Sequence, residues 1–282
     1  MKCRRAGWLN VVLVFVATSC GQPLKKALLP PEAITPSGRR CDRPAVYSHE
    51  NSEFHFARDN HSPYVPLLFG SPGMIPIAGD WNGDGFDTLG LYRPSTGYFF
   101  LTDQMIGGPA SNAFQYGPTG MLPIAGDWNG DGIDTVGLYD SATGTFLLTN
   151  VNAPGIAEHT FSFGGPGMFP VAGDWDGDGK DTVGVYDPKT GAFWLTNATP
   201  ASGPTIAFQF ARPGTGALAG DWNGDGKDTV GTYDPQEGFQ LAEENAGTAR
   251  TETVLLGGTG YSPLAGHWPE IFGGLNREVA AP

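Results

Sequence analysis

The chain has 282 residues, a formal net charge of −13, 43 Gly and 24 Pro. Such a share of Gly and Pro without order would indicate a low-complexity chain. Here they recur at the same turn positions of a repeat, which predicts a folded domain. The three cysteines are too few for a disulfide framework, and we expect no nucleic-acid partner for so acidic a chain.

Residues 1–19 have the pattern of a secretory signal peptide. Lys2, Arg4 and Arg5 precede a mostly apolar run over 8–17, which is too short to span a bilayer. The sequence Ala-Thr-Ser-Cys at 17–20 resembles the lipobox of bacterial lipoproteins, which implies lipidation at Cys20. Ordinary cleavage and an uncleaved anchor are the alternatives. Residues 20–43 are predicted to be a flexible tether, in which Cys41 would have no disulfide partner.

The phrase Ala-Gly-Asp-Trp occurs four times at intervals of 47 residues, and a degraded fifth copy places His267 in the Asp position. A repeat of this length predicts units that pack against neighbouring copies. In the third copy, four short apolar segments at 161–163, 168–173, 182–186 and 193–196 are separated by turn residues and predict four β-strands. Four strands in about 45 residues is the size of one propeller blade.

Each of these four strand types occurs five times, but the chain begins with the third and fourth types at 45–58. It ends with the first and second types at 253–268. We therefore expect an all-β, five-bladed β-propeller over 44–272, closed by pairing of N- and C-terminal strands, and a C-terminal tail at 273–282. Closure removes the unpaired strand edges of an open array. An open, solenoid-like stack is the alternative.

An eight-residue acidic loop follows each complete copy of Ala-Gly. Oxygen-bearing side chains at positions 1, 3 and 5, with Gly at position 6, form the opening of an EF-hand-type calcium loop. The alternative is a solvated turn built on local backbone hydrogen bonds. The loops contain thirteen aspartates, which repel unless neutralised, and predict up to four calcium ions. The predicted ligands are Asp80, Asn82, Asp84 and Asp87; Asp127, Asn129, Asp131 and Asp134; Asp174, Asp176, Asp178 and Asp181; and Asp221, Asn223, Asp225 and Asp228.

These loops and their flanking strands, over 45–268, resemble the FG-GAP and VCBS-type repeats of integrin α-chain propellers and many bacterial surface proteins. The resemblance implies calcium binding in loops of the pattern D-x-[DN]-x-D-G-x-x-D. This chain places the closing acid at position 8 instead of 9, so positions 1, 3 and 5 are the stronger ligand candidates. It also has five repeats, whereas propellers of that family usually have seven blades. The degraded loop at His267 should bind no metal.

A tryptophan follows the first loop position in all five copies. Because the copy without metal ligands keeps it, we expect these side chains to pack between blades. A ring of exposed platforms that stack on sugars is the alternative. The five residues are Trp81, Trp128, Trp175, Trp222 and Trp268.

Catalysis needs dissimilar groups that converge on one point, so the candidates are the residues that break the repeat. They show no metal-ligand spacing, nucleophile motif or phosphate-binding loop, and we expect no catalytic residues. The repeat-breaking residues are His49, His55, His61, Glu158, His159, Glu237 and Glu270.

The sequence thus predicts a non-catalytic, calcium-binding β-propeller that binds an unknown protein or carbohydrate as a monomer. We expect display at the cell envelope, on the outer membrane or cell surface, with membrane attachment only through the N-terminal lipid; secretion is the alternative. Two other functions stay open. One is a lectin with repeated sugar pockets, and the other is a five-bladed glycoside hydrolase-like enzyme with carboxylates lining the central tunnel.

Overall fold

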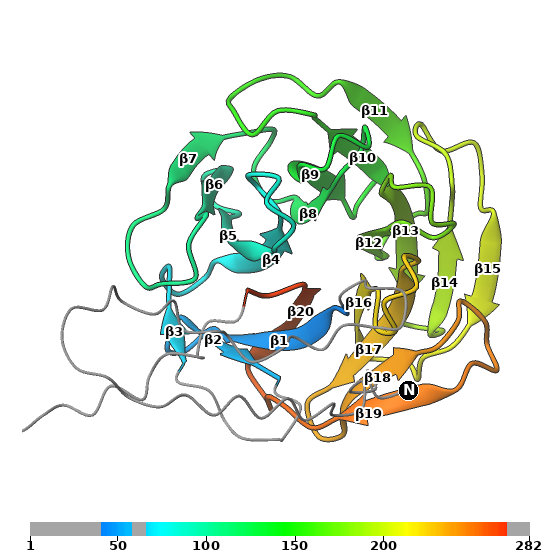
Figure 1. Cartoon of the computed structure of the whole chain (residues 1–282). Helices are drawn as coiled ribbons and strands as arrows, with labels where there is room; N and C mark the ends of the chain where they lie inside the picture. The colour runs from blue at the N-terminus through cyan, green and yellow to red at the C-terminus, as the bar shows by residue number, and fades with distance from the viewer. Residues whose placement is uncertain (1–40, 58–65, 270–282) are drawn as a thin grey trace, which may run out of the picture.

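The computed structural model describes residues 41–57 and 66–269, which form five four-stranded antiparallel sheets arranged in a ring (Figure 1). The predicted all-β, five-bladed propeller is confirmed. The part of the chain that the structure describes contains no helix long and apolar enough to cross a membrane. The predicted signal peptide, most of the tether and the predicted tail lie outside the described residues.

Four blades are continuous in sequence and run from an inner to an outer strand. The first consists of β4 (Ile75–Gly79), β5 (Thr88–Arg93), β6 (Tyr98–Leu101) and β7 (Asn112–Gln115). The second consists of β8 (Leu122–Gly126), β9 (Thr135–Asp140), β10 (Thr145–Leu148) and β11 (His159–Ser162). The third consists of β12 (Phe169–Gly173), β13 (Thr182–Asp187), β14 (Ala192–Leu195) and β15 (Ile206–Gln209). The fourth consists of β16 (Gly216–Gly220), β17 (Thr229–Asp234), β18 (Gly238–Ala242) and β19 (Thr251–Val254).

The fifth sheet, the closing blade, joins the two ends of the chain. Its order is β20 (Tyr261–Gly266), β1 (Arg43–Ser48), β2 (Glu53–Phe56) and β3 (Leu67–Leu68). β1 pairs with β20 along its whole length, from Arg43 opposite Gly266 to Ser48 opposite Tyr261. The two ends of the propeller therefore complete one blade, as predicted, and the open stack is wrong.

The sequence repeat is one strand out of phase with the blades. The first strand type of each sequence copy is the outer strand of the preceding blade, because it pairs with that blade's third strand, as β15 pairs with β14. The expectation that both C-terminal strands enter the closing blade is therefore half wrong. β19 pairs with β18 in the fourth blade, and β3 takes the outer place in the closing blade.

Aromatic pairs build the core between blades. On the second and third strands of the third blade, Tyr186 and Phe193 are cross-strand neighbours with ring centroids 4.8 Å apart, and both are fully buried. Such pairs add to the free energy of burial. The hairpin between them turns at Gly191, whose φ of 77° suits glycine and where a Cβ would lie against the Ala211 backbone.

The loop tryptophans complete these cores, which confirms the packing interpretation. The side chains of Trp81, Trp128 and Trp175 are 9%, 5% and 5% exposed. Each belongs to a hydrophobic cluster that combines two adjacent blades, and Trp222 and Trp268 pack against the equivalent clusters. Because buried rings cannot receive a sugar, the ring of tryptophan platforms is wrong.

The inner strands of adjacent blades contact one another around a central cavity. The cavity is open to solvent and has a volume of about 150 Å³. The side chains that line it are apolar, and every inner strand contributes the alanine of its Ala-Gly pair: Ala78, Ala125, Ala172, Ala219 and Ala265. The alanine of each Ala-Gly pair therefore lines the axis of the propeller.

Candidate functional site

Position 1 of each acidic loop organises the loop backbone. In the first loop, Oδ1 of Asp80 accepts the backbone N–H groups of Gly83 and Asp84 at 2.8 and 3.1 Å, and Oδ2 accepts that of Gly85 at 2.7 Å. The other three complete loops have the same bonds. The carboxylate fixes the tight turn, and Oδ2 retains acceptor capacity beyond its single N–H.

Positions 3 and 5 continue this network at the loop surface. Oδ1 of Asn82 accepts the N–H of Asp84 at 3.0 Å, and Oδ1 of Asp84 accepts the N–H of Phe86 at 3.0 Å. The local hydrogen bonds expected of a solvated turn are therefore present. They do not compete with metal binding, because carboxylate and amide oxygens each carry a second lone pair.

The third loop has the densest set of carboxylates. Asp174, Asp176 and Asp178 present oxygens that lie within 4.8 Å of one another. Oδ2 of Asp176 also accepts an N–H from the side chain of Asn197 at 2.8 Å. An all-oxygen set of this spacing fits a hard cation such as calcium. In the other three loops an amide oxygen of Asn82, Asn129 or Asn223 stands at position 3.

Position 8 makes a different contact, between blades. Oδ2 of Asp134 accepts the backbone N–H of Asp80 at 2.8 Å, and the N–H of Asp134 donates to the carbonyl of Asp80 at 2.9 Å. The same pair of hydrogen bonds links each blade to its neighbour. We call the five carboxylates the aspartate ring: Asp42, Asp87, Asp134, Asp181 and Asp228, bonded to Asp221, His267, Asp80, Asp127 and Asp174.

The sequence did not identify Asp42 as a member of this ring. It lies in the predicted tether at 20–43, yet it bonds to Asp221, and Arg43 next to it begins β1. Its only signal is position: Asp42 precedes β1 as Asp87 precedes β5. The neighbouring Cys41 is disulfide-bonded, so the expectation that it has no partner is wrong; the other cysteine lies outside the described residues.

Burial raises the pKa of every carboxyl in the aspartate ring. The pKa of Asp87 is raised from 3.8 to about 6 and that of Asp181 to about 7, while those of Asp42, Asp134 and Asp228 lie well above 3.8. Nearby aspartates raise them further, because like charges disfavour ionisation. The aspartate ring thus carries acids that are half-buried and that repel nearby aspartates when ionised.

The glycine of the Ala-Gly pair makes room for this ring. A Cβ at Gly79 would lie 2.9 Å from the Cβ of Asp134 and 2.8 Å from the ring of Trp81. Gly126, Gly173, Gly220 and Gly266 are equally confined by the next ring member and by a tryptophan. Each residue of the repeated phrase Ala-Gly-Asp-Trp therefore has its own role. The alanine lines the central cavity, and the glycine leaves space for the aspartate ring. The aspartate fixes the turn of the acidic loop, and the tryptophan packs in the core between blades.

On the opposite face of the propeller, the loop after each blade lies beside the β-hairpin of the next, and two grooves are found between such loops and hairpins. A tyrosine hydroxyl fixes each loop, as in the bond from Tyr139 to the carbonyl of Gly165 at 3.1 Å. The other four bonds run from Tyr47 to Ser71, Tyr92 to Pro118, Tyr186 to Arg212 and Tyr233 to Gly258. The same tyrosine hydrogen bond therefore fixes the loop after every blade.

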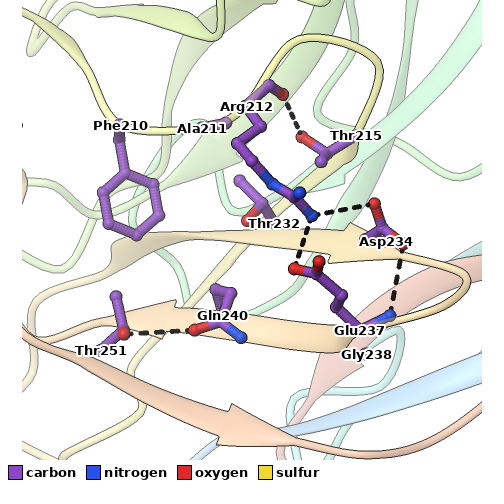
Figure 2. Close-up of a pocket in the computed structure, with 10 residues that line it drawn as sticks. All are labelled: Phe210, Ala211, Arg212, Thr215, Thr232, Asp234, Glu237, Gly238, Gln240 and Thr251. Atoms are coloured by element: carbon purple, nitrogen blue, oxygen red, sulfur yellow. Dashed lines mark hydrogen bonds and ion pairs between the residues drawn. The ribbon is translucent and has the colours of Figure 1, made fainter.

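One of these grooves, between the third and fourth blades, holds a polar pocket of about 190 Å³ (Figure 2). Arg212 on the loop pairs with Asp234 at 3.3 Å and with Glu237, both on the β17–β18 hairpin. Thr251 donates to Oε1 of Gln240 at 3.2 Å on the pocket floor. We call this pocket the Arg212 groove; its lining is Phe210, Ala211, Arg212, Thr215, Thr232, Asp234, Glu237, Gly238, Gln240 and Thr251.

The equivalent groove between the first and second blades is larger, about 330 Å³, but has a different lining. We call it the Asp140 groove; it is lined by Pro118, Thr119, Gly120, Met121, Asp140, Thr143, Thr145 and Leu147. In place of Arg212 it has Pro118, in place of Thr215 it has Met121, and in place of Gln240 it has Leu147. The two grooves share the tyrosine hydrogen bond that fixes the loop, but their lining side chains differ.

The repeat-breaking residues are distributed over several places. Glu237 lies in the Arg212 groove. His49 and His55 lie on the closing blade, where Nε2 of His49 is 2.7 Å from Oγ of Ser262. Glu158 accepts from the side chain of Asn150 at 2.7 Å. His159 begins β11, and His61 and Glu270 lie outside the described residues.

No protein-family model matches the sequence, and no curated protein matches it. Four solved chains resemble the fold. A lectin of Agrocybe aegerita, whose structure concerns recognition of non-reducing terminal N-acetylglucosamine, aligns with a TM-score of 0.41 and 12% identity over 77% of each chain. A chain from the crystal structure of BBS1N in complex with ARL6DN aligns with a TM-score of 0.39 and 11% identity, covering 73% of this chain and 62% of that one. At such low scores, neither alignment bears on the function of this chain.

Proposed function

We propose that this protein is a non-catalytic binding module, a calcium-stabilised propeller that binds a protein or glycan ligand in the Arg212 groove. The observation that supports the site is the concentration of unrepeated polar residues there. Arg212, Thr215 and Glu237 replace Gly165, Met168 and Thr190 of the preceding copy. Because these changes are clustered in one groove instead of scattered over the surface, they support a binding site there.

Calcium is the proposed cofactor of the four complete acidic loops. Positions 1, 3 and 5 would hold it, and the ion would neutralise the clustered carboxylates. Supporting this are the all-oxygen donors and the acceptor capacity that the local hydrogen bonds leave unused. The role of position 8 as a calcium ligand stays a prediction, since its Oδ2 atoms bond to the adjacent blade. The FG-GAP and VCBS-type resemblance of these loops is part of the same proposal.

Export to the cell envelope is proposed from the N-terminal sequence, with Cys20 as the lipidated residue. Lipidation of Cys20 excludes a disulfide between Cys20 and Cys41, because both use the Cys20 sulfur, and the following experiment decides between them. Replacing Cys20→Ser should move the protein from the membrane fraction to a soluble fraction, or leave its signal peptide unprocessed. Identical fractionation and identical mass of the wild type and the variant would contradict lipidation.

Two alternative functions receive less support. A lectin with repeated sugar pockets requires similar grooves, but the Arg212 and Asp140 grooves share few side chains in equivalent places. A glycoside hydrolase-like enzyme requires acids along the central tunnel, whereas the residues that line the central cavity are apolar. Both comparisons favour a binding module with one specialised groove.

The test is a binding screen with a groove variant. Full-length protein is applied to glycan and protein arrays in calcium and in EDTA. The double variant Arg212→Gly with Glu237→Thr restores residues that the preceding copy carries, so it should fold normally and lose the ligand. Thr143→Ala in the Asp140 groove is the matched control and should bind like wild type. Ligand binding that the double variant retains in full would show that the site lies elsewhere.

A further inference from the structure

The floor of the Arg212 groove is polar at both of two positions that are apolar in the first three blades, while the closing blade has one histidine there. Thr232 and Gln240 are cross-strand partners on β17 and β18, and Thr232 is buried. The floor residues equivalent to Gln240 are Phe100, Leu147, Trp194 and His55, and those equivalent to Thr232 are Leu91, Leu138, Val185 and Val46. Two adjacent changes from apolar to polar side chains in one groove indicate a ligand with polar groups.

The amide of Gln240 is held in a defined orientation. Thr251 and Thr253 both donate to its Oε1, at 3.2 and 3.0 Å. These two bonds use both lone pairs of the oxygen, and the NH₂ group points away from Thr251 (Figure 2). The groove floor therefore presents two N–H donors in a fixed direction, and a ligand that accepts from them loses little side-chain entropy.

The rim of the groove combines donors and acceptors with a small net charge. One guanidinium, that of Arg212, is paired with the carboxylates of Asp234 and Glu237. An anionic ligand would meet two carboxylates, and a cationic ligand would meet the guanidinium. A hydroxyl group both donates and accepts, so it can bond to either partner of these ion pairs without adding a charge.

The remaining wall supplies an apolar surface. The ring of Phe210 is half-buried and lies across the pocket from the ion pairs (Figure 2). A ligand ring with C–H groups on one face can pack against this aromatic side chain. The volume of about 190 Å³ is below the 300–1,000 Å³ that is typical for drug-sized ligands. The pocket therefore suits a single small ring.

From these four features we infer that the Arg212 groove binds one neutral, hydroxylated ring, a single sugar residue of a glycan, and that it is a single site per chain. This inference rests on the proposed binding function and names its ligand class. In the Asp140 groove, Leu147 stands in place of Gln240 and supplies no amide donors. In two other blades, a neighbouring side chain covers the equivalent floor residue. Arg93 lies over the ring of Phe100 at 5.0 Å, and in the closing blade Tyr261 packs its ring against His55 at 5.5 Å.

The experiment measures affinity and stoichiometry together. A glycan array with neutral, sialylated and sulfated members is followed by calorimetric titration with the methyl glycosides of the neutral sugars that bind. We expect one site per chain. The variant Gln240→Leu copies Leu147 of the second blade, so it should leave the melting temperature unchanged and weaken binding about tenfold through loss of the amide donors. Leu147→Ala in the Asp140 groove is the matched control and should not change affinity.

Several results would overturn the inference. These are a stoichiometry near five, a preference for charged glycans, and an affinity that Gln240→Leu leaves unchanged. Absence of any glycan binding would also overturn it. If a protein ligand is then found whose binding the Arg212→Gly with Glu237→Thr variant abolishes, the proposed binding function stands without the sugar. If that variant affects no ligand at all, the proposed groove fails as well.

Discussion

The two faces of this propeller follow opposite rules. On the face of the acidic loops, four copies keep the same residues at positions 1, 5 and 8 and the same hydrogen bonds at positions 1 and 8. On the hairpin face, the tyrosine bonds are constant but the groove linings differ. The repeated residues therefore stabilise the propeller, and the residues that differ between copies form the surface that can recognise a ligand.

The aspartates within one loop contribute to stability in two different ways. Positions 1, 3 and 5 bond within their own loop and lie near its surface, so they can share a cation. Position 8 is half-buried and bonds to the adjacent blade. A substitution at positions 1, 3 or 5 should lower stability by weakening calcium binding. A substitution at position 8 should lower it by weakening the contact between adjacent blades.

Removal of calcium should have the largest effect. A ligand that binds only the folded state adds about 2.7 kcal/mol per site when its free concentration is 100 times Kd, and four loops are available. We expect EDTA to lower the melting temperature markedly and added calcium to restore it. Asp178→Ala should reduce this calcium effect, whereas Asp103→Ala, an exposed acid outside the loops, should not. A melt that is the same in EDTA and in calcium would contradict the metal assignment.

Substitution in the aspartate ring should have the next largest effect. Asp134→Ala leaves the N–H of Asp80 without its acceptor, which should lower the free energy of unfolding by about 1–3 kcal/mol. Asp134→Asn keeps an acceptor oxygen and removes a buried charge, so in EDTA it should be at least as stable as wild type. Urea unfolding of both variants measures the difference. If the Asn variant also loses the calcium effect of its loop, position 8 is a ligand.

The sequence predicted most of the fold because the repeat fixes it locally. Turn residues and short apolar segments occur at the same places in each copy, and the tryptophan at position 2 survives in the copy that lost its loop. These features do not depend on distant parts of the chain. The phase of the blades could not be read in this way, because a repeated sequence has no natural start and β15 belongs to the third blade only through its pairing with β14.

The candidate site depended on long-range contacts. Asp42 is a lone acid in the predicted tether, and its partner Asp221 is 179 residues away. Arg212 and Glu237 stand in two separate turns of the same sequence copy, and nothing in the period shows that the loop after one blade meets the hairpin of the next. Only Glu237 was identified as a repeat-breaking residue. A search for polar substitutions at positions that are apolar in the other copies would also have found Thr232 and Gln240.

The pH dependence of stability should distinguish the buried ring from the loop surface. The pKa of Asp87 is about 6 and that of Asp181 about 7 in the folded protein, above the ordinary value of 3.8. The folded state then binds more protons than the unfolded state between these values, so the free energy of unfolding falls as pH rises from 3.8 to about 7. In EDTA, urea unfolding should show higher stability at pH 5 than at pH 8. The opposite slope would contradict the raised pKa values.

The smallest expected effect concerns the constant frame of the hairpin face. The hydroxyl of Tyr139 donates to the carbonyl of Gly165 at 3.1 Å, and its ring is fully buried. Tyr139→Phe keeps the ring and removes the bond, so it should lower the free energy of unfolding by about 1 kcal/mol. Tyr98→Phe is the control, because Tyr98 is 40% exposed and its substitution should change stability by less than about 0.5 kcal/mol. Because the calcium loops lie on the other face, the loss in Tyr139→Phe should be the same in calcium and in EDTA. A loss that depends on calcium would mean that the two faces are energetically coupled.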